Sequence, residues 1–322
     1  MKNLNKKTNE RLIKDIFFIV IFVIGIGLIS YGKILNIYEA ILLERQKENQ
    51  IKIDGSVLKL IPFKEKLSAV SYLVGELNRG KILLKKNENI HFFPASLSKL
   101  LTAIITIDTL PLDEEVVISD YALSAEGEEV NFKSGEKLKV LDLLKALLVS
   151  SSNDAAIALE EKVNNQGFNF LDLAQEKLRQ LNMNDSIFFD STGLDRKGNF
   201  TTASDLFLLS REIYKNYPLI GKITQEKDTE ISSIDGKERH FLKNTNELVS
   251  KLENLWAGKT GSTPIAGDCL LTIYEFTNPS KNDKIAIVII VLNSSDRFND
   301  TLKLYNWFEN VLNNSFLNKD QA

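Results

Sequence analysis

The feature that most constrains the fold of this chain is a short, almost purely apolar run at residues 284–292, KIAIVIIVL. An alternating pattern leaves one face of a strand in water, whereas a continuous run predicts a strand that is covered on both faces. Two more strand-like segments precede it, at 255–261 and 268–276. Together they predict the centre of a β-sheet that has other elements packed on both sides.

Strand signals recur at the start of the globular region, and helical spacing dominates between the two strand-rich parts. Residues 67–86 contain two β-rich runs around Asn78-Arg79-Gly80, which predicts a hairpin. Helical spacing is found at 96–110, at 140–163 with a polar break at 150–154, at 171–181, at 203–214 and at 297–312. This order predicts an α/β (α+β) fold, with one sheet assembled from both ends of the domain and a helical insertion between them.

The N-terminal region predicts a membrane segment. Residues 16–30 (IFFIVIFVIGIGLIS) are uninterruptedly apolar and follow five basic residues, an arrangement that keeps an N-terminus in the cytoplasm. We expect a cytoplasmic tail at 1–15, a single transmembrane signal-anchor at 16–32 and an extracytoplasmic tether at 33–66 that contains an amphipathic helix at 34–51. A cleaved signal peptide is the alternative, because Ser30-Tyr31-Gly32 resembles a cleavage site.

Composition excludes several classes of function. Lys and Arg number 40 against 43 Asp and Glu, so the formal net charge of −3 gives no basic excess for nucleic acid. The single cysteine, Cys269, excludes an intrachain disulfide and is expected to pack as a small apolar residue. The two histidines, His91 and His240, have no second ligand at metal-binding spacing. We therefore expect no metal and no cofactor.

A serine and a lysine one helical turn apart provide the first chemical signal. Ser96 and Lys99 lie on the same face of the helix predicted at 96–110. A serine hydroxyl needs a base to become a nucleophile, and a lysine can be that base if burial lowers the pKa of its amine. The Ser-x-x-Lys spacing also occurs at Ser30, Ser56 and Ser134, but only Ser96 opens a long apolar helix that can bury the amine.

Two further motifs strengthen the signal. Ser151 and Asn153 lie at the break between helical segments, where both side chains can point into one cleft, although the same residue types also suit a helix cap. Lys259-Thr260-Gly261 places a cation and a hydroxyl on a predicted strand, next to a glycine that lets a ligand approach the backbone. The related triplet at 133–135 is predicted to be a turn.

Taken in order, the three motifs resemble those of serine β-lactamases and penicillin-binding proteins. Flanking segments make the chain similar to the D-alanyl-D-alanine carboxypeptidase family in particular: Pro94-Ala95-Ser96, Asn153-Asp154-Ala155-Ala156, Asp190-Ser191-Thr192-Gly193-Leu194, Thr202-Ala203-Ser204-Asp205-Leu206 and Gly258-Lys259-Thr260-Gly261-Ser262-Thr263. The resemblance implies a β-lactamase/transpeptidase-like domain at 67–313, with a mainly antiparallel sheet and an all-α subdomain, followed by a tail at 314–322.

The resemblance also implies roles for eight site residues. Ser96 would form the acyl-enzyme, Lys99 would accept its proton, and Ser151 would relay a proton to the leaving amine. The substrate would be held by Asn153, Lys259, Thr260, Gly261 and Ser262, with the backbone amides of Ser96 and Ser262 forming the oxyanion hole. The expected substrate is a peptidoglycan stem peptide ending in D-Ala-D-Ala, on the outer side of a bacterial cell membrane, and β-lactams are the expected covalent inhibitors.

Several alternatives and departures remain. A DD-endopeptidase would use the same residues; a class A β-lactamase would need a Glu-x-x-Leu-Asn run, which this chain lacks; and a non-catalytic sensor would carry further membrane helices. A Ser-His-Asp hydrolase is disfavoured because there is no Gly-x-Ser-x-Gly and neither histidine has an evident partner. Relatives often have His at position 199 and a small residue at position 152, where this chain has Asn199 and Ser152. Glutamates at 126, 128 and 129 predict an unusually acidic cleft rim.

Overall fold

The computed structural model describes residues 50–53, 56–277 and 283–316. The chain divides into two units, Met1–Ile61 and Pro62–Ala322. In the described part of the first unit, β1 (Gln50–Ile53) pairs antiparallel with β2 (Ser56–Lys59). The amphipathic helix predicted at 34–51 is therefore wrong at its last two residues, which belong to β1; its remainder lies outside the described residues.

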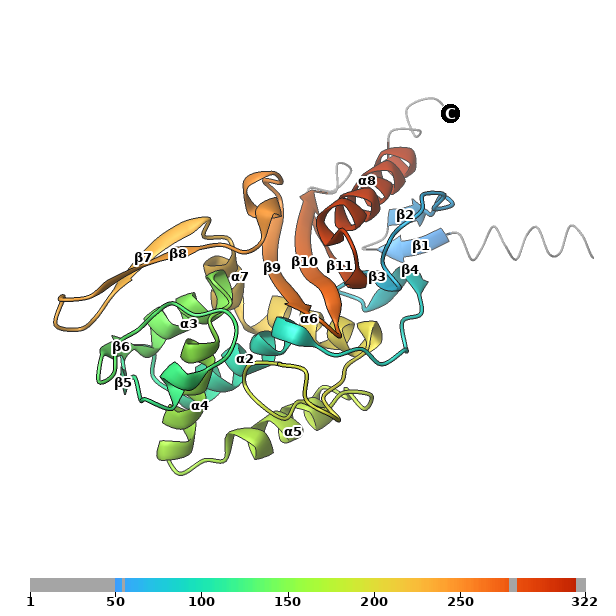
Figure 1. The fold of residues 1–322 in the computed structure, drawn as a ribbon. Coiled ribbons are helices and arrows are strands. Elements are labelled where there is room, and N and C mark those ends of the chain that lie inside the picture. Colours follow the sequence, from blue (N-terminus) through green and yellow to red (C-terminus); the bar gives the residue numbers. More distant parts are fainter. Residues whose placement is uncertain (1–49, 54–55, 278–282, 317–322) are drawn as a thin grey trace, which may run out of the picture. The chain divides into compact units, whose positions relative to one another are not determined.

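A five-stranded antiparallel sheet forms the centre of the second unit (Figure 1). Its strand order is β4-β3-β11-β10-β9, so β9 lies at one edge. The strands are β3 (Ser71–Glu76), β4 (Lys81–Lys86), β9 (Leu255–Thr263), β10 (Gly267–Thr277) and β11 (Lys284–Ser294). β11 is the middle strand, and every residue from Ile285 to Leu292 is buried. The prediction of a fully covered strand is confirmed.

Helices cover both faces of this sheet. The helices of the second unit are α2 (Lys99–Thr109), α3 (Val140–Val149), α4 (Asn153–Asn165), α5 (Phe170–Gln180), α6 (Ala203–Asn216), α7 (Pro218–Thr224) and α8 (Arg297–Phe316). α8 packs on β10 and β11, and α6 packs on β3 and β11. Gly75 of β3 allows the close approach of α6, because a Cβ there would lie 2.4 Å from the Phe207 ring.

The helical insertion is built around α2, which packs against α3, α4 and α5 (Figure 1). The insertion is not purely helical, as the predicted all-α subdomain would be. A small hairpin pairs β5 (Glu115–Val117) with β6 (Lys137–Lys139), and a longer one pairs β7 (Asp228–Ser232) with β8 (Arg239–Lys243). Both hairpins are two-stranded and separate from the main sheet. Their strands are only three and five residues long, which is too short for a clear strand pattern in the sequence.

The predicted membrane segment at 16–32 lies outside the described residues. Within the described ranges, no helix is both long enough and apolar enough to cross a membrane.

Candidate functional site

Ser96 lies on a short 3₁₀ helix, Ala95–Ser98, that leads directly into α2. This short helix packs against β9 at Gly261, where a Cβ would lie 3.0 Å from the Ala95 Cβ and 3.1 Å from the Ser96 backbone nitrogen. A glycine at position 261 therefore lets the edge strand approach the backbone of the serine. The close approach of a ligand, for which the sequence predicted this glycine, stays a prediction.

Lys99 directs its amine at the Ser96 hydroxyl. The Nζ atom donates to Ser96 Oγ at 2.8 Å and to the carbonyl oxygen of Thr192 at 2.9 Å. The lysine is completely buried, and the loss of hydration lowers the pKa of its amine to about 7, although the negative charge of Asp190 opposes this shift. An amine with such a pKa is partly neutral near pH 7 and can accept the proton of the hydroxyl next to it.

A second buried lysine approaches from β9. Lys259 Nζ donates to Ser151 Oγ at 2.8 Å and to the carbonyl oxygen of Thr260 at 2.8 Å. Burial holds the pKa of Lys259 well below its usual value, and the positive charges of Lys99 and Arg297 add to the shift. The sheet thus contributes one amine, Lys259, and the helical part of the domain contributes the second amine, Lys99, and both hydroxyls.

Ser151 and Asn153 lie at the junction of α3 and α4, as the polar break in the sequence predicted. Asn153 is buried, and its Nδ2 donates to the carbonyl oxygen of Glu126. Among the described residues its Oδ1 has no hydrogen-bond partner, so an acceptor remains for a donor on a ligand. Ser152 accepts a hydrogen bond from the Ala155 amide and caps α4.

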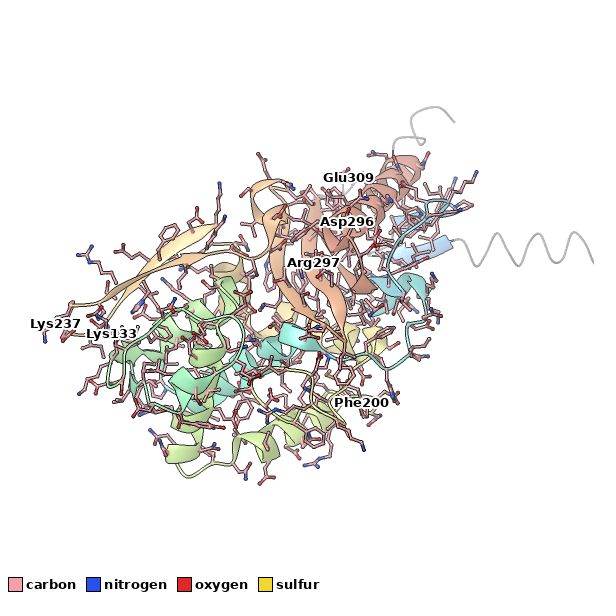
Figure 2. The ribbon with its side chains drawn as sticks, in the orientation of Figure 1. Lys133, Phe200, Lys237, Asp296, Arg297 and Glu309 are labelled. Atoms are coloured by element: carbon pink, nitrogen blue, oxygen red, sulfur yellow. The ribbon has the colours of Figure 1, made fainter. Side chains whose placement is uncertain are left out.

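Thr260, Gly261 and Ser262 follow Lys259 along β9. The Thr260 hydroxyl lies 2.6 Å from that of Thr245, whereas Ser262 is exposed. Arg297 is the first residue of α8 (Figure 2). It donates from Nη1 to the carbonyl oxygen of Gly261 at 3.0 Å. Arg297 was not predicted, because nothing in the sequence links it to a strand that lies 36 positions earlier.

The segment 190–194 is a second part of the site to which the sequence alone gave no role. Asp190 Oδ1 accepts hydrogen bonds from the Thr192 amide, the Thr192 hydroxyl and the Gly193 amide, at 2.7–2.8 Å. These bonds fix the Thr192 carbonyl that receives the Lys99 amine. Asp, Ser, Thr and Gly in succession are a turn signal that could have revealed the structure, but not the function, of this loop.

A cavity of about 500 Å³ adjoins the site and is markedly acidic. Its carboxylates come from the 125–131 loop, α4 and the 190–196 segment: Glu126, Glu160, Asp190 and Asp195. One cation, Arg196, also lines it, and its Nε lies 3.0 Å from Asp190 Oδ2. Glu126, one of the glutamates that the sequence predicted on an acidic cleft rim, thus lines this cavity.

The histidines and the cysteine lie elsewhere. The expectation that neither histidine has a partner is wrong: His240 Nε2 lies 2.7 Å from Glu136 Oε1 in a buried pair, and His91 lies 3.5 Å from Asp185. Neither pair includes a serine, so neither forms a Ser-His-Asp arrangement. Cys269 is buried, and in the ranges that the structure describes no His, Cys, Asp and Glu cluster could hold a metal ion.

Known proteins are similar to this chain in sequence and in fold. Residues 59–295 match the D-alanyl-D-alanine carboxypeptidase family. The D-alanyl-D-alanine carboxypeptidases DacF of Bacillus subtilis and DacC of Escherichia coli are each 28% identical, over 70% and 75% of this chain, which spans 58% and 61% of their lengths. A D-alanyl-D-alanine endopeptidase of Pseudomonas aeruginosa is 29% identical over 77% of this chain and 80% of its own length.

Solved structures with the same fold include members of this family. The D-alanyl-D-alanine carboxypeptidase DacD of Francisella tularensis matches with a TM-score of 0.69 and 25% identity over 77% of this chain and 72% of its own. Penicillin-binding protein D2 of Listeria monocytogenes, in its ampicillin-bound form, matches with a TM-score of 0.66 and 27% identity over 77% of this chain and 99% of its own. The family match extends over most of the described second unit and includes all three motifs, so this chain belongs to the D-alanyl-D-alanine carboxypeptidase family.

Proposed function

We propose that this protein is a serine-type D-Ala-D-Ala carboxypeptidase, which removes the terminal D-alanine from peptidoglycan stem peptides. The observation that carries the proposal is the buried Lys99 amine, whose pKa is lowered to about 7 and which lies 2.8 Å from the Ser96 hydroxyl. This pairing gives a serine a base without histidine or metal.

In the proposed reaction, Ser96 Oγ attacks the carbonyl carbon between the last two D-alanines while its proton passes to Lys99. The backbone amides of Ser96 and Ser262 stabilise the negative charge on the carbonyl oxygen. Ser151, hydrogen-bonded to Lys259, relays a proton to the departing D-alanine amine. Water then attacks the ester on Ser96; its hydroxyl becomes part of the new carboxyl group of the shortened peptide, and its proton restores the Ser96 hydroxyl.

The edge position of β9 supports a mode of substrate binding. The peptide would add to this edge as an extra strand, and its terminal carboxylate would meet Lys259 and Thr260. Asn153 Oδ1, which has no hydrogen-bond partner among the described residues, would accept the hydrogen bond of a substrate amide. β-Lactams would acylate Ser96 in the same cleft.

The proposal places the catalytic domain outside the cytoplasm, on the bacterial cell membrane. Its support is the apolar run at 16–30, preceded by basic residues, which would anchor the chain as a single-pass protein. The D-alanine-terminated peptides on which the domain would act belong to the cell wall, on that same side.

A DD-endopeptidase that cuts peptidoglycan crosslinks is the second candidate. The relative from Pseudomonas aeruginosa favours it, because this chain spans 80% of that endopeptidase but only 58% of the carboxypeptidase DacF. Both reactions pass through the same acyl-enzyme and differ in the amine that leaves.

The test is intact-mass spectrometry of the full chain in detergent, incubated with benzylpenicillin or with a peptide ending in Lys-D-Ala-D-Ala. A penicilloyl adduct on Ser96, absent from Ser96→Ala, together with release of one D-alanine is the expected result. An adduct without D-alanine release, combined with cleavage of crosslinked muropeptides, would favour the endopeptidase. Rapid penicillin hydrolysis without a lasting adduct would indicate a β-lactamase, and no reaction would overturn the proposal.

A further inference from the structure

Two neighbouring cavities lie where β9 begins and β10 ends, apart from the Ser96 cleft. Their volumes are about 280 Å³ and 780 Å³, and Trp256 and Glu275 line both. We call the pair the Trp256 groove. Thr260 lies four positions after Trp256 along β9, a distance of about 13 Å at ~3.3 Å per residue. None of the eight proposed site residues lines either cavity.

Trp256 is held in one orientation by its neighbours. Its ring meets Tyr214 edge to face, with 4.9 Å between ring centroids. Beneath it lies Gly221 of α7, where a Cβ would come within 2.9 Å of the indole. Gln225 donates to the Trp256 carbonyl oxygen at 2.6 Å. A rigid, partly exposed indole is a preformed surface for a ligand, because little side-chain entropy is lost on binding.

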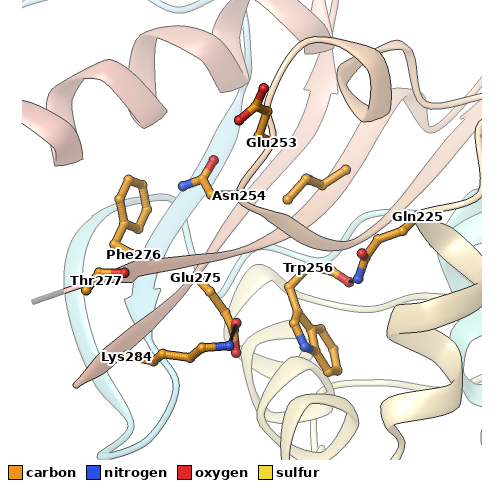
Figure 3. Close-up of a pocket in the computed structure, with 9 residues that line it drawn as sticks. Gln225, Glu253, Asn254, Trp256, Glu275, Phe276, Thr277 and Lys284 are labelled. Atoms are coloured by element: carbon orange, nitrogen blue, oxygen red, sulfur yellow. Dashed lines mark hydrogen bonds and ion pairs between the residues drawn. The ribbon is translucent and has the colours of Figure 1, made fainter. Parts of the chain in front are cut away.

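Polar groups surround this ring, and their charges cancel. Figure 3 shows Trp256 on one side of the smaller cavity and the Glu275–Lys284 ion pair across from it. The lining of the whole groove contains three acidic residues, Glu212, Glu253 and Glu275, and three basic residues, Arg211, Lys215 and Lys284. The formal charges of the lining thus sum to zero, a balance that suits an uncharged ligand.

Side-chain amides account for most of the remaining polar lining. They come from Asn78, Gln180, Asn182, Gln225 and Asn254. Asn254 Oδ1 accepts from the Tyr305 hydroxyl, which leaves its NH₂ group to donate elsewhere. Amides both donate and accept, and so they match ligands rich in hydroxyl and acetamido groups.

We propose that the Trp256 groove binds a neutral glycan that carries N-acetylated amino sugars. The indole would pack against the C–H face of a pyranose ring, the side-chain amides would pair with acetamido groups, and Glu253 would accept from a sugar hydroxyl. The groove would hold the enzyme on a sugar chain while the Ser96 cleft stays open. This assignment is independent of the proposed peptidase reaction, because it uses none of the same residues.

The test is a titration of the full chain in detergent with the β-1,4-linked tetramer of N-acetylglucosamine, followed by tryptophan fluorescence and calorimetry. The chain has two tryptophans, Trp256 and the buried Trp307. The fluorescence change should persist in Trp307→Phe and vanish in Trp256→Phe. Because Trp256→Phe disturbs packing on Gly221, the exposed Glu253→Ala serves as a second variant, with at least fivefold weaker binding expected.

Controls separate this inference from the peptidase proposal. Glu65→Ala removes an exposed glutamate outside the groove and should bind as the wild type does, and Ser96→Ala should bind the tetramer unchanged. The deacetylated tetramer should bind at least tenfold more weakly. No measurable binding of the tetramer, or binding that Glu253→Ala leaves unchanged, would overturn the assignment; equal binding of the deacetylated form would remove acetamido recognition.

Discussion

Gly193 and Ala95 are so closely packed that a Cβ on Gly193 would lie 2.0 Å from the Ala95 carbonyl oxygen. This contact presses the 190–194 loop against the backbone just before the nucleophile. The same Cβ would lie 2.1 Å from the Ser98 hydroxyl oxygen. No rotamer change relieves a clash with backbone, so one of the two segments must move if any side chain is added.

Gly193→Ala is therefore expected to destabilise the fold by several kcal/mol, at the upper end of single substitutions, ~3–5 kcal/mol. It should also slow acylation by benzylpenicillin, because the Thr192 carbonyl and Lys99 shift together. The matched control is Gly167→Ala, which has a similar positive φ of 87° but nothing within 4 Å of the new Cβ. That variant should lose only about 1 kcal/mol; equal losses in urea unfolding would contradict the packing argument.

Acylation should depend on pH through the amine of Lys99. Its pKa is lowered to about 7, and only the neutral amine accepts the Ser96 proton. The second-order rate constant for acylation by benzylpenicillin should therefore level off above pH 7 and fall about tenfold per pH unit below it. A profile that is flat between pH 5 and 8, with the fold intact by circular dichroism, would exclude Lys99 as the base.

Asp190→Asn should shift the fall in the acylation rate constant to lower pH. The Asp190 carboxylate raises the pKa of Lys99 against the effect of burial, so removing its charge lowers the pKa of the amine further. The asparagine oxygen can still accept the hydrogen bonds of the 190–194 loop, which keeps the geometry. Glu230→Gln is the control, because it removes an exposed carboxylate on β7 and should leave the profile in place.

Ser151 offers a pair of variants with the same chemical loss and different backbone strain. Its φ is 62°, a conformation that favours glycine. Ser151→Gly and Ser151→Ala both remove the hydroxyl that accepts from Lys259, so both should lose most of the acylation rate. Ser151→Gly should nevertheless be the more stable of the two by about 1 kcal/mol in thermal unfolding. Equal stability of the two variants would show that the backbone at 151 is unstrained.

The sequence predicted the parts of the structure in which a pattern repeats. The run that became β11 and the spacing of α5 and α6 are local signals, and the three motifs lie on local elements that bring them together once the sheet forms. The α-helix predicted from residue 96 begins only at Lys99, because Ala95–Ser98 forms a 3₁₀ helix packed on β9.

Other features depend on contacts between distant segments and could not be predicted. Arg297 contacts Gly261, and both β10 and β11 lie between these two residues in the sequence. The role of Asp190 rests on three hydrogen bonds to the 190–194 loop, whose path follows no periodic sequence pattern. The short α7 was missed although Pro218 at its start is a helix signal, since seven residues carry little periodicity.

The two buried amines also bear on what selection has favoured in this protein. Burying a lysine amine costs desolvation free energy, and exchanging buried charged groups for apolar side chains of similar size is often neutral or stabilising. A lineage released from selection for chemistry would be expected to drift toward leucine or methionine at both positions. Lys99 and Lys259, each with a hydroxyl at 2.8 Å, are therefore residues whose presence is explained by turnover and not by stability.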